Sequence, residues 1–207
     1  MKRSAGERPL REGEPPPGRH ANPERMADAR AAGRHGPWLA VVRGVGRGFG
    51  LLPRALAAVA SLGWMLSIWW LSSGPIDIRV SVPASDFFWN LAHAPVFGLL
   101  AALVATAAAS RPLPRAWPHP GRLAWLVAFL AVAAWAAIDE LHQARSGRHG
   151  SVFDVATDLT GAACVLWWAS YAGQHGADEK GMRRRIAAGA GLCAAAAGLT
   201  TLVDRLG

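Results

Sequence analysis

Long apolar segments alternate with short polar ones along most of this chain. Five segments are apolar for about 18 to 23 residues, close to the length that an α-helix needs to cross the hydrocarbon of a bilayer. They cover residues 55–73, 87–109, 123–143, 152–172 and 186–203. None of them alternates apolar and polar residues as a half-buried strand does. The pattern predicts an all-α fold, a polytopic transmembrane helical bundle with four core spans and a weaker fifth rich in Ala and Gly.

The remaining segments differ in composition from the spans. Residues 1–36 are rich in Pro, Arg and Glu without an apolar period, which predicts a disordered basic tail. Residues 37–54 mix apolar groups with Arg43 and Arg47, as interfacial segments do. Residues 173–185 form a basic loop between the fourth and fifth spans. The predicted organisation is therefore a tail, an interfacial segment, a four-span domain over 55–172, a loop, and a fifth span over 186–203.

Composition excludes an ordinary water-soluble domain. Hydrophobic residues make up 52% of the 207 residues and charged residues 17%, whereas soluble domains carry about 25% charged residues. The two cysteines, Cys164 and Cys193, lie inside apolar segments. Two cysteines in such places do not make a disulfide framework or a zinc site, so we expect small apolar side chains in helix packing.

The net charge of +8 raises the question of a nucleic-acid partner. A nucleic-acid reader needs basic residues on a folded, water-facing surface, but here they lie in the tail and in short loops, so nucleic acid is excluded. Eleven Lys and Arg flank the spans on the side of the N-terminus, against four on the other side. Because cytoplasmic loops are enriched in Lys and Arg, we expect a cell (inner) membrane protein with a cytoplasmic N-terminus and an extracytoplasmic 139–154 segment.

Ionisable and other polar residues gather toward the predicted outer ends of spans two, three and four. They are His93 in span two, Asp139, Glu140, His142 and Gln143 at the end of span three, Arg148 in the loop, and Asp154 and Asp158 in span four. Ser151 precedes span four as a predicted N-cap, with Asp154 at the third helical position in a capping-box arrangement.

Helix geometry predicts that several of these groups meet. At 1.5 Å per residue, His93 and Asp158 each lie roughly 10 Å below the outer end of their spans. Asp139, His142 and Gln143 are spaced to share a helix face, and Gly161 allows a neighbouring helix to approach closely. An unpaired acid at the bilayer centre costs about 2.5–3.5 kcal/mol. The acids should therefore face the interior of the bundle, in a polar pocket that opens to the outside.

These residues closely resemble a known signature. The segment 139–161, DELHQARSGRHGSVFDVATDLTG, is similar to that of VanZ-like membrane proteins, and the matching positions are Asp139, Glu140, Gln143, Arg148, Asp154 and Gly161. His93 and the LSSGP of residues 71–75 also resemble that family. Two positions depart from it: Asp158 stands where the family commonly has Asn, and Asn90 where it commonly has Lys. The resemblance implies an envelope-related role in a bacterial membrane, in a family named for a member linked to teicoplanin resistance.

Three functions remain open at this stage. The pocket processes a membrane lipid or lipid-linked envelope precursor, or is a structural network that only holds the helices together. In the third hypothesis it binds an envelope head group or carries a proton coupled to lipid movement. In the enzymatic hypothesis Asp139, Glu140 or His142 acts as general base, and His93, Gln143, Arg148, Asp154 and Asp158 bind the substrate. Arg148 would hold a phosphate, with help from Arg145. Acid clusters more often form polar networks than metal sites, so we expect neither a metal nor a cofactor. Assembly into a homo-oligomer is compatible with every hypothesis.

Overall fold

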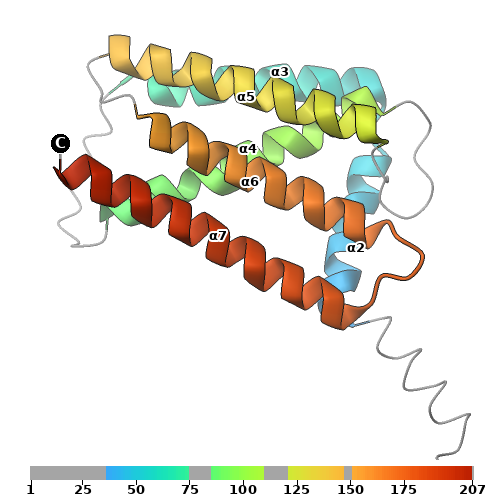
Figure 1. The fold of residues 1–207 in the computed structure, drawn as a ribbon. Helices are drawn as coiled ribbons and strands as arrows, with labels where there is room; N and C mark the ends of the chain where they lie inside the picture. The colour runs from blue at the N-terminus through green and yellow to red at the C-terminus, as the bar shows by residue number, and fades with distance from the viewer. Residues whose placement is uncertain (1–35, 75–84, 110–120, 147–150, 207) are drawn as a thin grey trace, which may run out of the picture.

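The computed structural model describes residues 36–74, 85–109, 121–146 and 151–206. All regular structure within these ranges is α-helical (Figure 1). The helices are α2 (Pro37–Gly50), α3 (Arg54–Ser72), α4 (Ser85–Ala108), α5 (Arg122–Arg145), α6 (Val152–Ala172) and α7 (Glu179–Leu206). The predicted disordered tail falls almost entirely outside the described residues.

Five of these helices, α3 to α7, are long and apolar enough to cross a membrane. This confirms the prediction of an all-α polytopic bundle, and the ends of α3 to α6 lie within two residues of the predicted spans. The fifth helix differs more, since α7 begins at Glu179 rather than at residue 186. Its first turns carry Lys180 and Arg183. Lys and Arg have high helix propensity but are costly inside a membrane, so the helix begins before the apolar segment does.

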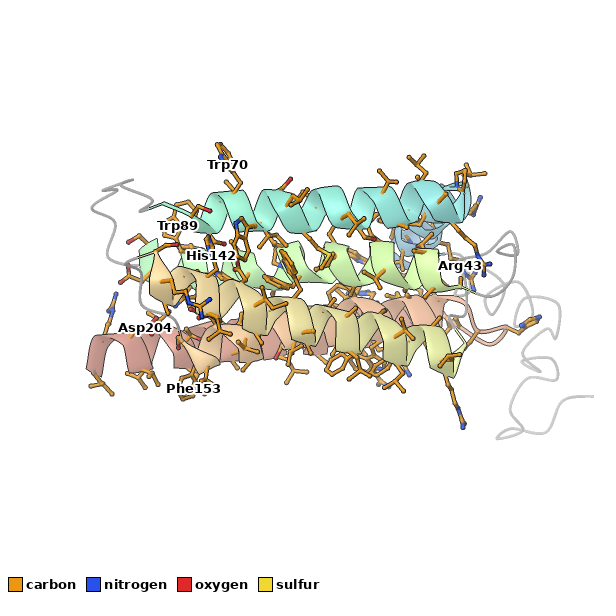
Figure 2. All side chains as sticks on the ribbon, turned by 90° about the horizontal axis from the view of Figure 1, so that it is seen from above. Arg43, Trp70, Trp89, His142, Phe153 and Asp204 are labelled. Atoms are coloured by element: carbon orange, nitrogen blue, oxygen red, sulfur yellow. The ribbon has the colours of Figure 1, made fainter. Side chains whose placement is uncertain are left out.

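The outer surface of the bundle is apolar. On α3, the exposed side chains include Val59, Leu62, Leu66 and Trp70, spaced three or four residues apart and 61–77% exposed. Figure 2 shows Trp70 projecting away from the other helices. A continuous exposed apolar stripe of this kind is favourable in contact with lipid but unfavourable in contact with water. The chain is therefore a multi-pass α-helical membrane protein.

Helix α4 lies at the centre and contacts each of the other described helices. Its Phe97 and Leu100 pack with Val132 of α5 and Leu166 of α6 in the largest buried apolar cluster. The approach to α6 depends on Gly161, where a Cβ atom would overlap the backbone of Ala94. The predicted close approach at Gly161 is thus confirmed, and it holds α4 and α6 in a fixed register.

Helix α2 is short and runs across the bundle where α6 ends and α7 begins (Figure 1). Its first backbone N–H groups, at Trp38 and Leu39, donate to the Glu179 carboxylate at 3.3 and 3.0 Å. Further along, Arg43 Nε donates to the carbonyl of Ala172 at 3.1 Å. These contacts tie α2 to one end of the bundle, opposite the end that carries the predicted site.

Candidate functional site

The acidic residues of the sequence motif are buried together at one end of the bundle. Among the described residues, the buried side chains with a formal charge are Asp139, Glu140, Asp154 and Asp158, each 9% exposed or less. In Figure 2, His142, Trp89 and Asp204 lie at this end, whereas Arg43 lies at the other. The start of α4, the end of α5 and the start of α6 meet here, as the topology predicts.

His93 of α4 and Asp158 of α6 form a direct pair. The His93 Nδ1 and Asp158 Oδ1 atoms are 2.9 Å apart, and the two side chains are 22% and 1% exposed. The close contact at Gly161, one turn beyond Asp158, brings the two helices near enough for this bond. The prediction that these two residues lie at similar depth in the bundle and meet is confirmed.

Asp139 and Gln143 line the candidate pocket one turn apart on α5. Gln143 Nε2 donates to Asp139 Oδ2 at 2.9 Å. The second oxygen, Asp139 Oδ1, is buried and has no hydrogen-bond partner within the described part of the chain. The amide therefore orients the carboxyl group and leaves its second oxygen without a donor among the described residues.

Glu140 contacts the start of the next helix instead of the pocket. The backbone N–H of Ser151 donates to Glu140 Oε2 at 2.5 Å, and Ser151 Oγ accepts from the N–H of Phe153 at 3.2 Å. Ser151 is thus the N-cap that the sequence predicts. The capping-box prediction, in which Asp154 accepts from the backbone N–H of Ser151, is wrong. Glu140 from the preceding helix accepts from that N–H instead. Asp154 instead lines the pocket.

His142 does not line the pocket. Its ring stacks on Trp69 of α3 with centroids 3.6 Å apart, and its Nε2 is 2.9 Å from Ser73 Oγ. On a helix with 3.6 residues per turn, positions 142 and 143 point about 100° apart. The pocket includes the side of α5 with Asp139 and Gln143, so His142 faces α3. Of the three residues predicted to share a helix face, only Asp139 and Gln143 line the pocket.

The pocket has a volume of about 600 Å³ and receives side chains from all five long helices. The sequence predicts a pocket among α4, α5 and α6 only. The structure adds Ser72 from the end of α3, and Thr201, Asp204 and Arg205 from the end of α7.

Two polar contacts that were not predicted from the sequence hold α7 to α4. Asn90 Nδ2 donates to Thr201 Oγ1 at 3.0 Å, and Arg205 is 3.1 Å from Asp86 Oδ2 at the rim. The signal was present in Thr200 and Thr201 near the end of the predicted fifth span and in Asp204 and Arg205 just beyond it. An antiparallel fifth span brings them to the same end as the motif.

Arg148 falls outside the described residues, so the structure does not place the predicted phosphate ligand. Its neighbour Arg145, at the end of α5, is exposed. No group of three or more His, Cys, Asp or Glu in the described ranges could hold a metal ion. Cys164 of α6 and Cys193 of α7 are free, buried thiols, and their sulfur atoms are 4.0 Å apart.

A second, apolar pocket of about 670 Å³ lies among α2, α4, α6 and α7. Its lining on α4 runs from Phe88 to Ala102, a length of about 21 Å at 1.5 Å per residue. Ala92 lines both this pocket and the polar one. A polar and an elongated apolar space are thus neighbours along the same helix.

No family model, curated protein or solved structure matches this chain. Fold and surface define its class as a multi-pass α-helical membrane protein with buried acidic groups at one end. The resemblance to VanZ-like proteins stays a prediction from the motif residues.

Proposed function

We propose that this protein is a VanZ-like protein of the bacterial inner membrane whose outward-facing pocket binds or processes an envelope or lipid-linked intermediate. The observation that carries the proposal is the pocket itself. Apolar packing alone is enough to hold a helical bundle together. This bundle nevertheless places acidic side chains around a space of about 600 Å³. Ionisable groups inside membrane segments are costly and are kept mainly where they serve a function.

The proposed orientation places α2 on the cytoplasmic side. Arg43, Arg47 and Arg54 lie at or near α2, and Lys180 and Arg183 begin α7 at the same end. Under the positive-inside rule this end is cytoplasmic, and the pocket end faces out.

Cysteine labelling tests the orientation. Ser146 follows α5 at the pocket end, and exposed Gln174 lies between α6 and α7. Each is changed to Cys in a protein whose Cys164 and Cys193 have been replaced by Ala. An impermeant thiol reagent added to intact cells should label Ser146→Cys and not Gln174→Cys. The reverse pattern would overturn the orientation.

The lipid character of the ligand is supported by the neighbouring apolar pocket. Its length of about 21 Å exceeds half of the roughly 30 Å hydrocarbon thickness. A head group in the polar pocket and a chain along Phe88 to Ala102 would use both spaces at once, since Ala92 lines both. Ligand sites commonly pair such an apolar wall with a few convergent polar groups.

The polar pocket is closed toward the cytoplasmic end by apolar packing. Beyond His93, the described part of α4 contributes Phe97, Leu100 and Ala101 to the buried core, with Val132 of α5 against them. This arrangement favours a one-sided binding site over a polar route across the membrane.

The structural alternative also has an observation behind it. The bonds between His93 and Asp158 and between Ser151 and Glu140 each join two elements of the bundle. A network with only this role would lose the folded protein when it is broken, and it would have no ligand.

Two variants separate these hypotheses. Asp139→Asn removes a charge from the pocket lining, whereas His142→Gln changes a residue outside it. If the pocket binds an envelope lipid, wild type and His142→Gln should co-purify with it and Asp139→Asn should not, at equal abundance in the membrane. Native mass spectrometry of the purified proteins makes the comparison. Absence of bound lipid from all three proteins, with normal abundance, would refute the proposed function.

A further inference from the structure

Carboxyl groups outnumber basic groups in the described lining of the polar pocket. Of the described residues, four acids line it, namely Asp86, Asp139, Asp154 and Asp204, against the basic side chains Arg205 and His93. Both basic groups are engaged with acids, Arg205 with Asp86 at 3.1 Å and His93 with Asp158 at 2.9 Å. The described lining therefore favours a cationic group over an anionic one.

Asp139 shows which kind of cation fits. It is 2% exposed and lines the pocket, and Gln143 occupies only its Oδ2 atom. The buried Oδ1 atom has no donor among the described residues. A buried acceptor without a donor is costly, so the missing component should be a positive group that carries N–H bonds.

A primary ammonium group meets both requirements, since it presents three donors and no acceptor. A quaternary ammonium group carries the same charge without N–H donors, and it would leave Oδ1 unsatisfied. A divalent metal is disfavoured because the described His, Cys, Asp and Glu do not form a three-ligand group. A phosphate attached to such an ammonium group would lie at the rim, where the guanidinium of Arg205 is 56% exposed.

We infer that the pocket recognises a primary ammonium group next to a phosphate, as in an ethanolamine phospholipid head group, with Asp139 as its principal acceptor. The inference rests on the proposed function and specifies the ligand class of the same pocket. The same chemistry occurs in lipid-free phosphoethanolamine, so the experiment includes both sources.

The test uses the full chain in nanodiscs of phosphatidylcholine alone, or with added phosphatidylethanolamine or phosphatidylglycerol. Tm is followed by the fluorescence of the 10 Trp residues. Phosphatidylethanolamine should raise Tm of wild type, and Asp139→Asn should abolish this increase. Asp178→Asn is the matched control, since Asp178 is exposed outside the helices at the other end, and it should keep the increase.

A second measurement needs no variant. Phosphoethanolamine and phosphocholine are titrated into wild type in phosphatidylcholine nanodiscs by calorimetry. A charge-assisted hydrogen bond is expected to make phosphoethanolamine bind at least about tenfold more tightly. Binding of the lipid-free compound means that the head group suffices, whereas stabilisation by the lipid alone means that the chains are also required.

The outcomes separate this inference from the proposed function. The ammonium inference is overturned if added phosphatidylethanolamine gives wild type the same Tm as phosphatidylcholine alone. It is also overturned if the increase in Tm persists in Asp139→Asn. Stabilisation by phosphatidylglycerol alone, lost in Asp139→Asn, overturns it but leaves a lipid-binding pocket. A protein that responds to none of these lipids and retains no envelope lipid on purification contradicts both.

Discussion

The pair between His93 and Asp158 allows a quantitative test of how the acidic end is held together. Replacing His93 by Ala removes the donor to Asp158 Oδ1, which is 2.9 Å away. The other oxygen, Oδ2, already lacks a partner in the described structure, and Asp158 is 1% exposed. The variant therefore leaves a buried carboxyl group without either of its acceptor sites satisfied.

Leaving a buried polar group unsatisfied costs about 1–3 kcal/mol. For a chain of this size, a loss of 1 kcal/mol lowers Tm by about 2–4 °C, so His93→Ala should lower Tm by about 2–12 °C. Fluorescence-detected size-exclusion chromatography after heating in mild detergent measures this shift. His93→Gln, which keeps a donor near the same place, should recover part of it.

His175→Ala serves as the matched control, since His175 is exposed in the loop between α6 and α7. It removes the same side chain without disturbing a buried partner, and its Tm should stay within about 1 °C of wild type. If His93→Ala proves as stable as His175→Ala, the buried pair contributes no measurable stability. That result would refute the idea that the bond between His93 and Asp158 stabilises this end of the bundle.

Three further predictions concern other parts of the bundle. Gly161→Val should destabilise the protein by about 1–3 kcal/mol, because its side chain overlaps the backbone of Ala94; Gly63→Val, with open space around it, is the control in the same heating assay. Glu179→Ala should increase hydrogen exchange at the start of α2, because it removes the acceptor of two N–H groups there; unchanged exchange would contradict this docking. The N–H of Gly181 and a tyrosine hydroxyl donate to Asp178 and hold its pKa below the ordinary value. The stabilisation is therefore present above the unfolded-state pKa and is lost as the pH falls through the folded-state pKa, so Asp178→Asn should flatten the acid limb of the pH–Tm profile.

The spans could be predicted closely from the sequence because each is a local property. A run of about 20 apolar residues is sufficient to define a transmembrane helix whatever its neighbours are. The ends of α3 to α6 accordingly agree with the sequence to within two residues. The start of α7 was misplaced because hydropathy marks where a helix enters the hydrocarbon, and a charged helix can continue beyond it.

The candidate site was predicted in part. The depth of His93 and Asp158 follows from counting residues along antiparallel spans, and Gly161 indicates a close approach by its size alone. The direction of His142 was harder to predict, since a spacing of three or four residues limits a side chain to a broad sector. Contact with Trp69 of α3 decides the actual direction.

The sequence by itself determined that this chain crosses a membrane with its acidic residues at one end, because apolar length and helical rise are local quantities. The tertiary structure alone decided which of those acids face a shared space. It paired Glu140 with the backbone of Ser151, turned His142 toward α3, and brought Asp204 and Arg205 of α7 to the pocket of Asp139. These outcomes depend on helix rotation and on which helices become neighbours, and both are set by packing between segments far apart in the chain.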